Sequence, residues 1–254
     1  MHLKTNLHSH TGDDPRDFVP YTTREGIDHA ALHGFDALAL TCHQKAAWAP
    51  EYAAYAAKRG ILLIPGVELD MHETDGSTGR RGRHLIILNC DKDAERVRTF
   101  SDLCDYRTAH PQSFVLTPHP FSYGNFSLKK FLEKHIHLID AIEHTWFHSP
   151  RFNRNKKAAY AAVRHQLPMI VTSEDAHTFD NLHTDYALVD AEEKTIPSLF
   201  GAIRQHKITN VTHPKKLVRE MALPGAALVS KNFLYRRGWK NHTSRTTSVK
   251  SAVL

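Results

Sequence analysis

Short runs of apolar and β-branched residues alternate with longer amphipathic stretches along this chain, and seven of these runs have the length of a β-strand. This alternation predicts βα units that build one sheet of mostly parallel strands. The predicted strands are LKTNLH (3–8), DALALT (36–41), ILLIPGVE (61–68), HLIILNC (84–90), SFVLTP (113–118), IDAIEH (139–144) and PMIVTS (168–173).

Helix signals lie between most of these runs. Thr22 or Thr23 can cap a helix that stops at Gly34, and Pro50 suits the first turn of a helix closed by Gly60. Four further segments have helical patterns, whereas the polar, glycine-rich segment 71–83 is typical of a loop or hairpin. The four segments are 92–107, 127–135, 151–166 and 195–206.

Seven βα-like units in one domain predict an α/β barrel, although an open doubly wound sheet fits the same alternation. The positions of the polar residues favour the barrel. Functional groups of α/β barrels stand at the C-terminal ends of the strands, and nearly every predicted strand here ends in, or is followed by, His, Asp or Glu.

The first strand runs into His8 and His10, whose side chains point to the same side of an extended chain and could bind one ion. Asp13 and Asp14 follow at once. One of these carboxylates could ligate a metal or orient a neighbouring ligand, and a simple Asp-Pro turn is the alternative. The second strand is followed by His43, which could equally be an ordinary loop residue.

Glu68 ends an almost wholly apolar strand, where an unpaired carboxylate would be costly. Its partner could be a metal or a buried arginine. His84 and His119 begin or follow later strands, and Asp175 and His177 repeat the two-residue spacing of His8 and His10. Imidazole and carboxylate together suit divalent zinc, manganese or iron.

Composition adds three points. The net charge of +6 lies in the C-terminal segment 221–254, which holds six of the 33 basic residues and no acidic one, so 27 basic and 27 acidic residues remain in 1–220. Of the 20 histidines, we interpret His29, His33, His135 and His137 as ordinary surface or packing residues. The three cysteines have no CxxC spacing, which argues against a structural zinc knuckle.

We expect one catalytic domain, 1–220, and a basic C-terminal extension, 221–254, disordered in part. The sequence has no secretory leader and no apolar run long enough to span a membrane, so we expect a cytoplasmic protein with no membrane partner. Oligomeric state cannot be deduced. The basic extension could contact a nucleic-acid backbone electrostatically.

Taken together, HSHTGDDP, REGIDHAALHGFDALALTCH, PGVE, HLIIL, Pro118-His119-Pro120, IEHTW and SEDAH resemble the polymerase and histidinol phosphatase (PHP) domain family over roughly residues 1–190. The resemblance implies a distorted seven-stranded barrel, (β/α)7, and a trinuclear metal centre that commonly hydrolyses phosphate esters. The chain departs from the family at Cys42, where an aspartate is usual, at His144, where a small or apolar residue is common, and at Glu174.

Carried over to this sequence, the resemblance implies three ion sites. His8 and His10 would bind the first ion, with Glu68 as a bridge and Asp175 as a further ligand. Glu68, His84 and His119 would bind the second ion. Asp14, His43 and His177 would hold the third, with Asp14 preferred to Asp13. Glu68, Asp175 and His177 would be catalytic.

We therefore predict a phosphoesterase that cleaves a small phosphomonoester or phosphodiester with two or three divalent ions (zinc, manganese or iron) and hydroxide formed from bound water. Two alternatives remain. One is an amidohydrolase-like enzyme that cleaves C–N bonds, and the other is a non-catalytic metal-binding module whose basic tail contacts nucleic acid.

Overall fold

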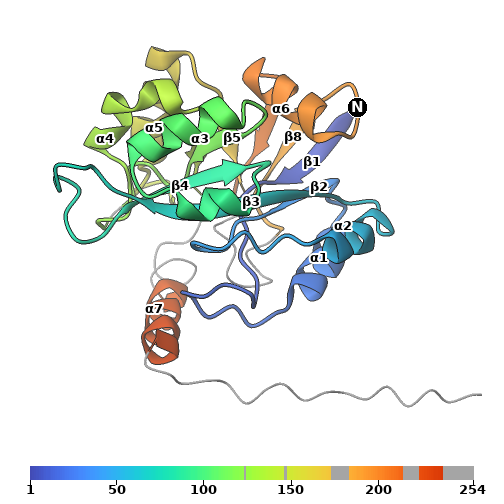
Figure 1. The fold of residues 1–254 in the computed structure, drawn as a ribbon. Coiled ribbons are helices and arrows are strands. Elements are labelled where there is room, and N and C mark those ends of the chain that lie inside the picture. The colour runs from blue at the N-terminus through green and yellow to red at the C-terminus, as the bar shows by residue number, and fades with distance from the viewer. Residues whose placement is uncertain (123, 146–147, 173–182, 214–222, 237–254) are drawn as a thin grey trace, which may run out of the picture.

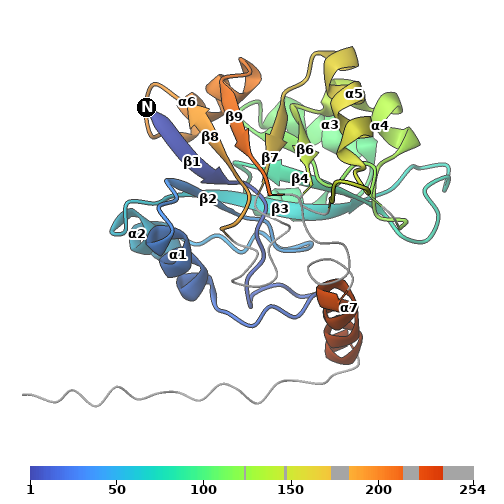
Figure 2. The ribbon, with the colours of Figure 1, turned by 180° about the vertical axis from the view of Figure 1, so that it is seen from behind.

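The computed structural model describes residues 1–254 except 123, 146–147, 173–182, 214–222 and 237–254. The described part contains a nine-stranded sheet that rolls into a nearly closed barrel with helices packed around it (Figure 1, and from behind in Figure 2). In sheet order the strands are β7 (Met169–Val171), β6 (Ala141–His144), β5 (Phe114–Thr117), β4 (Arg83–Leu88), β3 (Leu62–Met71), β2 (Ala37–Leu40), β1 (His2–Asn6), β8 (Tyr186–Asp190) and β9 (Ile208–Val211).

Helices connect most of these strands and follow the predicted positions closely. Thr22 caps α1 with a capping box, as its sequence predicts, and Pro50 opens α2. The segment 92–107 is split, because its backbone becomes extended at Val97 and a new helix begins after Thr99. The helices are α1 (Thr23–Leu32), α2 (Pro50–Ala57), η1 (Lys92–Arg96), α3 (Phe100–Ala109), α4 (Lys130–Lys134), η2 (Ile136–Leu138), α5 (Asn155–His165), α6 (Ile196–Arg204) and α7 (Leu223–Arg236).

The predicted barrel is confirmed, but its sheet is more mixed than the alternation indicates. All seven predicted strands are present, and β8 and β9 are added to them. Of the eight neighbouring strand pairs in the described residues, four are parallel and four are antiparallel. β4 runs against both of its neighbours because the short 71–83 connection returns the chain as a hairpin, with no crossover helix.

A side chain on β9 links the two edge strands of the barrel. The amide oxygen of Asn210 accepts a hydrogen bond from the backbone N–H of Val171 at 2.8 Å, and its amide nitrogen donates to the carbonyl of Met169 at 2.8 Å. These bonds join the two edge strands, β7 and β9, whose ladder is otherwise open. The side-chain link satisfies backbone groups that an open edge would leave unpaired.

Strand β3 places Glu68 inside the barrel by simple alternation. Val67, Leu69 and Met71 face outwards into the apolar cluster beneath α3, α4 and α5. Ile64 and Glu68 face the other way, because successive side chains of a strand point to opposite faces. The acid therefore enters the barrel from a strand whose other face is held by apolar packing.

The barrel interior is filled at one end and polar at the other. Phe114 and Phe200 stack with their ring centroids 4.5 Å apart, where α6 covers the end at which the parallel strands begin. The opposite end, where β1, β2 and β3 finish, carries the predicted ligands. This arrangement leaves one rigid, apolar support beneath the polar mouth.

The C-terminal extension forms a helix over part of its length. In α7, Asn232 accepts a hydrogen bond from the backbone N–H of Phe18 at 2.9 Å, and the Tyr235 hydroxyl lies 3.4 Å from the carbonyl of Asp14. The helix therefore contacts the loop that follows β1. Within the described residues, we find no helix whose length and apolar character would let it cross a membrane.

Gly66 is expected to be essential for the position of Glu68. A Cβ atom at this residue would lie 2.9 Å from the Leu88 side chain, 3.0 Å from the Leu40 carbonyl and 3.1 Å from Thr41. Overpacking of this kind costs typically about 1–3 kcal/mol. We predict that Gly66→Ala lowers the free energy of unfolding by that amount in urea denaturation.

Gly201→Ala is the matched control, because nothing lies within 4 Å of a Cβ atom placed there in α6. Alanine favours a helix interior over glycine by up to about 1 kcal/mol, so this variant should be neutral or more stable. A Gly66→Ala protein as stable as the wild type would show that β3 is not tightly confined at this point.

Candidate metal centre

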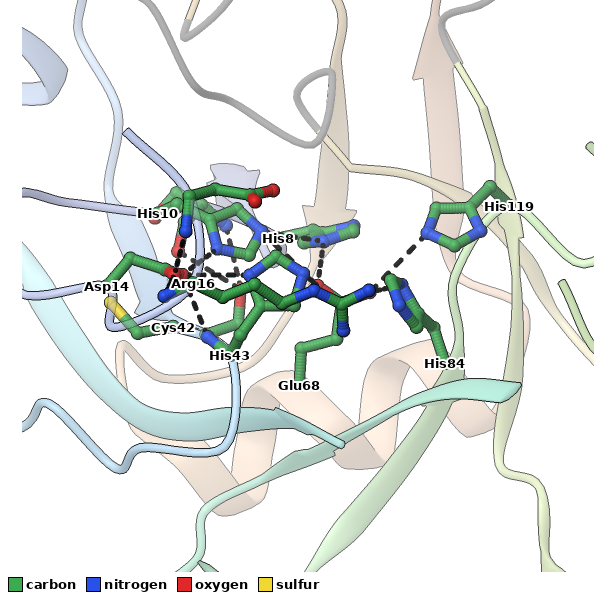
Figure 3. A network of polar contacts seen from close by, with 12 residues as sticks. His8, His10, Asp14, Arg16, Cys42, His43, Glu68, His84 and His119 are labelled. Atoms are coloured by element: carbon green, nitrogen blue, oxygen red, sulfur yellow. Dashed lines mark hydrogen bonds and ion pairs between the residues drawn. The ribbon is translucent and has the colours of Figure 1, made fainter. Parts of the chain in front are cut away.

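Five histidine side chains surround the carboxylate of Glu68 at the barrel mouth, and Asp14 lies beside them (Figure 3). The structure thus brings together seven of the nine side chains that the sequence predicts as ligands. Asp175 and His177 lie outside the described residues. The seven are His8, His10, Asp14, His43, Glu68, His84 and His119, all buried.

The five histidines divide between the two oxygens of Glu68. At Oε2, the Nε2 atoms of His8, His10 and His43 lie at 3.4, 3.3 and 3.2 Å. The Nε2 atoms of His8 and His10 are also 3.3 Å from each other. Two nitrogens bound about 2.0 Å from one tetrahedral ion would stand roughly 3.3 Å apart.

The other oxygen of Glu68, Oε1, faces the remaining two rings. The Nδ1 atom of His84 lies 2.7 Å from it and the Nε2 atom of His119 lies 3.4 Å away. One carboxylate therefore stands between two groups of imidazoles, one at each oxygen. A bridging carboxylate between two cations requires this arrangement.

These close approaches leave several of the polar atoms without a hydrogen bond. Among the described residues, neither oxygen of Glu68 has a hydrogen-bond partner, and the same holds for both ring nitrogens of His84 and for Nδ1 of His119. Buried polar atoms without partners are rare and costly. Imidazole and carboxylate lone pairs that converge in this way fit divalent cations, so the residues present suit the metals that the sequence predicts.

Asp14 holds two of the rings in place. Its Oδ2 atom accepts hydrogen bonds from Nδ1 of His10 at 2.7 Å and from Nδ1 of His43 at 2.9 Å, while Oδ1 accepts the backbone N–H groups of Arg16 and Asp17. Burial alone would raise the pKa of Asp14, but the two histidines hold it well below its usual range. The ionised carboxylate turns both Nε2 atoms towards Glu68.

Asp13 has different surroundings from Asp14. Its carboxylate accepts a hydrogen bond from the Thr23 hydroxyl at 2.8 Å and pairs with Lys45 at 3.3 Å. Asp13 is thus directed at α1 and the surface, whereas Asp14 is buried against the histidines. Of the two acids that the sequence left ambiguous, Asp14 is the one within the cluster.

Glu143, on β6, supports the cluster from behind. Its Oε1 atom lies 2.8 Å from Nδ1 of His8 and also accepts the hydroxyl of Thr172, while Oε2 accepts the backbone N–H of His119. A carboxylate on the far nitrogen of a ligating histidine fixes its tautomer and raises its basicity. Glu143 therefore positions two of the predicted ligands at once.

Asp70 and Arg16 support the opposite side. Asp70 lies two residues after Glu68 on β3, with its Oδ1 3.3 Å from Nε2 of His84, and Arg16 donates to both of its oxygens at 2.9 Å. Burial alone would lower the pKa of His84, whereas Glu68 and Asp70 raise it to about 9. This ring is protonated at neutral pH unless a cation takes the place of the proton.

Cys42 stands between Thr41 and His43 but does not face the ring nitrogens. Its sulfur lies 3.6 Å from the Thr11 hydroxyl, and burial raises the pKa of the thiol. The thiol is therefore held protonated beside a hydroxyl. The aspartate expected from the family pattern at this position is replaced by a neutral packing residue.

Sequence reasoning missed three residues that orient this cluster: Arg16, Asp70 and Glu143. Glu143 had a usable signal, because it is an acid within an otherwise buried strand, as Glu68 is. Asp70 could have been found from its two-residue spacing to Glu68, which places both on one face of β3. Arg16 had no signal beyond its closeness to Asp14.

His144 is a partly buried histidine at the C-terminal end of β6. Its ring lies 5.0 Å from that of His148, edge to face, and its Nδ1 atom has no hydrogen-bond partner among the described residues. Burial, with His148 next, lowers the pKa of His144 to about 4. The ring is therefore neutral at physiological pH.

The family assignment follows from a comparison of the sequence with family profiles. The profile of the PHP domain matches residues 6–184, well over half of the chain. This chain belongs to the PHP domain family, and the resemblance seen in the sequence is confirmed. No individually curated protein matches the chain.

Solved structures with the same fold share little sequence with it. A two-domain protein from Bacteroides vulgatus containing a predicted PHP-like metal-dependent phosphoesterase has a TM-score of 0.59 at 18% identity, over 84% of this chain and 65% of its own. A lesion-specific endonuclease from Pyrococcus furiosus has a TM-score of 0.62 at 15% identity, over 91% and 66%. The chain thus spans just under two thirds of these two proteins.

A third structure of this fold is described as an amidohydrolase from Chromobacterium violaceum with bound sulfate and no metal. Its TM-score is 0.53 at 18% identity, over 81% of this chain and 97% of its own. At these identities the likeness shows the fold alone. The fold is therefore shared by proteins described as different kinds of hydrolase.

Glu143→Gln tests the support of the histidines. The amide removes the charge that faces His8 and directs an N–H₂ group at one of three donors. Loss of such a partner typically lowers metal affinity about 10- to 100-fold. We predict a loss of that size for zinc or manganese in competition with a chromogenic chelator, with Glu51→Gln, at an exposed acid of α2, as the control. Equal affinities in both variants would remove the role given to Glu143.

Because the pKa of His144 is low in the folded protein, this ring makes the free energy of unfolding depend on pH. Between pH 6.5 and about 4 the unfolded chain protonates this ring and the folded chain does not, so stability falls as the pH falls through that window. At about 1.4 kcal/mol per pKa unit, the total is roughly 3 kcal/mol. Urea titrations should show that wild type loses more stability than His144→Gln as the pH falls from 6.5 to about 4. A difference that does not change with pH would contradict the low pKa.

Proposed function

We propose that this protein is a metal-dependent phosphoesterase that hydrolyses a phosphomonoester or small phosphodiester at a di- or trinuclear centre. Its membership of the PHP domain family supports the reaction class. The observation that carries the proposal is the position of Glu68, whose two buried oxygens each face a separate group of histidines and have no hydrogen-bond partner in the described structure.

Two of the proposed ion sites follow from the way the histidines divide between the two oxygens of Glu68. His8 and His10 with Oε2 of Glu68 would hold one ion, and His84 and His119 with Oε1 would hold a second. The third site, with Asp14, His43 and His177, and the ligand role of Asp175 stay predictions from the sequence, because Asp14 here accepts a hydrogen bond from Nδ1 of His43. When bound, such ions supply an acidified water and positive charge at the phosphoryl oxygens.

The protein's own residues prepare the site for this chemistry. Asp14 and Glu143 keep the rings of His8, His10 and His43 turned inwards, which avoids reorganisation when charge develops. Arg16 lies beside the cluster (Figure 3), and its guanidinium pairs with Asp70 at 2.9 Å. We infer that this positive charge also draws the phosphate of the substrate towards the mouth.

Two alternative functions are each supported by a solved structure of this fold. The amidohydrolase from Chromobacterium violaceum has this fold, so C–N hydrolysis is the first alternative. The Pyrococcus furiosus structure is that of an endonuclease, and a related structure, endonuclease Q, holds a 27-mer duplex with an abasic lesion at its active site. A nucleic-acid substrate is therefore the second alternative, and the basic residues of 221–254 would assist it electrostatically.

Glu68→Gln tests the proposed bridge. The substitution keeps the shape of the side chain but removes the charge between the two groups of rings. We predict that hydrolysis of p-nitrophenyl phosphate falls by two orders of magnitude or more, a loss comparable to removal of one strongly stabilising active-site group (about 10²- to 10³-fold). Glu192→Gln, at an exposed acid, is the control.

Circular dichroism should show that both variants are folded, and metal analysis should show fewer bound ions only in Glu68→Gln. Full turnover by this variant would contradict the bridge. The substrate class is tested with three probes on the metal-loaded wild type: p-nitrophenyl phosphate, bis-p-nitrophenyl phosphate and a p-nitroanilide. Cleavage of the anilide alone would replace the proposal by the amidohydrolase alternative.

A further inference from the structure

Three histidines form a second cluster far from Glu68, on the outer surface of the barrel. His29 lies in the last turn of α1, His33 is its C-cap residue, and His183 precedes β8. Each of the three is only partly buried. The sequence alone indicates ordinary surface or packing residues at His29 and His33, because nothing in it places His183 beside them.

The nitrogens of these rings are close enough to share one ion. One ring nitrogen from each residue can be chosen so that all three lie within 4.8 Å of one another. The Nε2 atom of His29 and the Nδ1 atom of His183 are 3.2 Å apart. This separation matches the roughly 3.3 Å between two ligands bound about 2.0 Å from a tetrahedral zinc ion.

The helix end favours a cation at this position. α1 places its C-terminus at His33, where the helix dipole is negative and attracts positive charge. Burial, then His183 and then Lys4, lower the pKa of His33, so this ring is neutral at physiological pH. A neutral imidazole has a free lone pair, which a metal ligand needs. The ammonium of Lys4 already bonds the His33 carbonyl at 2.8 Å and partly opposes this attraction.

One ring must turn for all three to bind. His33 and His183 are stacked, with centroids 3.9 Å apart and an angle of 11° between their planes. The lone pairs of nearly parallel rings lie in separate planes, so both rings cannot point at one ion as they stand. Rotation about the Cβ–Cγ bond of His33 corrects this, and that torsion is broad and soft.

We propose that His29, His33 and His183 form a second metal site, which takes a borderline divalent ion such as Zn²⁺ with water as the fourth ligand. Three imidazoles are a ligand set that zinc, copper and nickel accept. The ion would fasten His183 to α1. His183 follows the predicted ligands Asp175 and His177 by eight and six residues, so the site would anchor the chain segment that carries them.

This site is separate from the cluster around Glu68. The other end of α1 lies beside the loop that follows β1, where the Thr23 hydroxyl bonds Thr11 at 2.9 Å and Asp13 at 2.8 Å, and Asp14 of the cluster is the next residue. A ten-residue helix is about 15 Å long. An ion at the C-terminal end therefore cannot share ligands with the proposed catalytic ions, and its binding can be measured independently of hydrolysis.

Residue-resolved carbethoxylation of the full chain tests the proposal. Diethyl pyrocarbonate modifies accessible neutral histidines, and peptide mass spectrometry reports each histidine separately. We expect Zn²⁺ in excess to slow the modification of His29, His33 and His183 at least tenfold. The exposed His2 and His206 are internal references and should react at unchanged rates.

His33→Gln should abolish the zinc-dependent protection of His29 and His183, and His29→Gln should abolish that of His33 and His183. Absence of protection in the wild type would overturn the proposal. Equal protection of His29 and His183 in wild type and His33→Gln would overturn it too, because the three residues would then not be joint ligands.

Discussion

The buried carboxylate of Glu68 is the constraint on which the rest of the structure depends. An anion that is fully enclosed and has no hydrogen bond is stable only if opposite charge is placed against it. The surrounding chain supplies five imidazoles at its two oxygens, and it fixes them by a second layer of carboxylates. Burial alone would raise the pKa of Glu68, whereas the histidines, His84 first, hold it well below its usual range.

Apolar packing of the barrel fixes the strands that carry the polar mouth. Outward apolar residues of β3 pack under the helices, so that the inward acid cannot slip to the other face without exposing them. One of the residues with unusual backbone lies at the same place: His119 has a φ of 30°, in the left-handed region that a residue with a side chain seldom adopts. The carboxylate of Glu143, which accepts the His119 backbone N–H, holds that conformation.

The sequence predicted the parts of this design that have a periodic or compositional signal. Apolar runs located the first seven strands, and acids or histidines at their ends located the mouth. β8 and β9 were missed because neither has a continuous apolar run: only two alternate residues of β8 are buried, and β9 has no buried residue. The antiparallel direction of β4 depends on long-range pairing, which periodicity does not report. The supporting roles of Asp70 and Glu143 also require distances between residues remote in the chain, and the same is true of the contact between His183 and α1.

X-ray diffraction from crystals grown with zinc or manganese, recorded at the absorption edge of the metal, shows whether Glu68 stands between two ions. We expect anomalous peaks on both sides of Glu68, one among His8, His10 and Oε2 and one among His84, His119 and Oε1. A Glu68 carboxylate with no ion at either oxygen, in crystals where the metal is abundant, would contradict this expectation. Its charge would then be balanced by protonated histidines alone, and the cluster would be a structural ion-pair network.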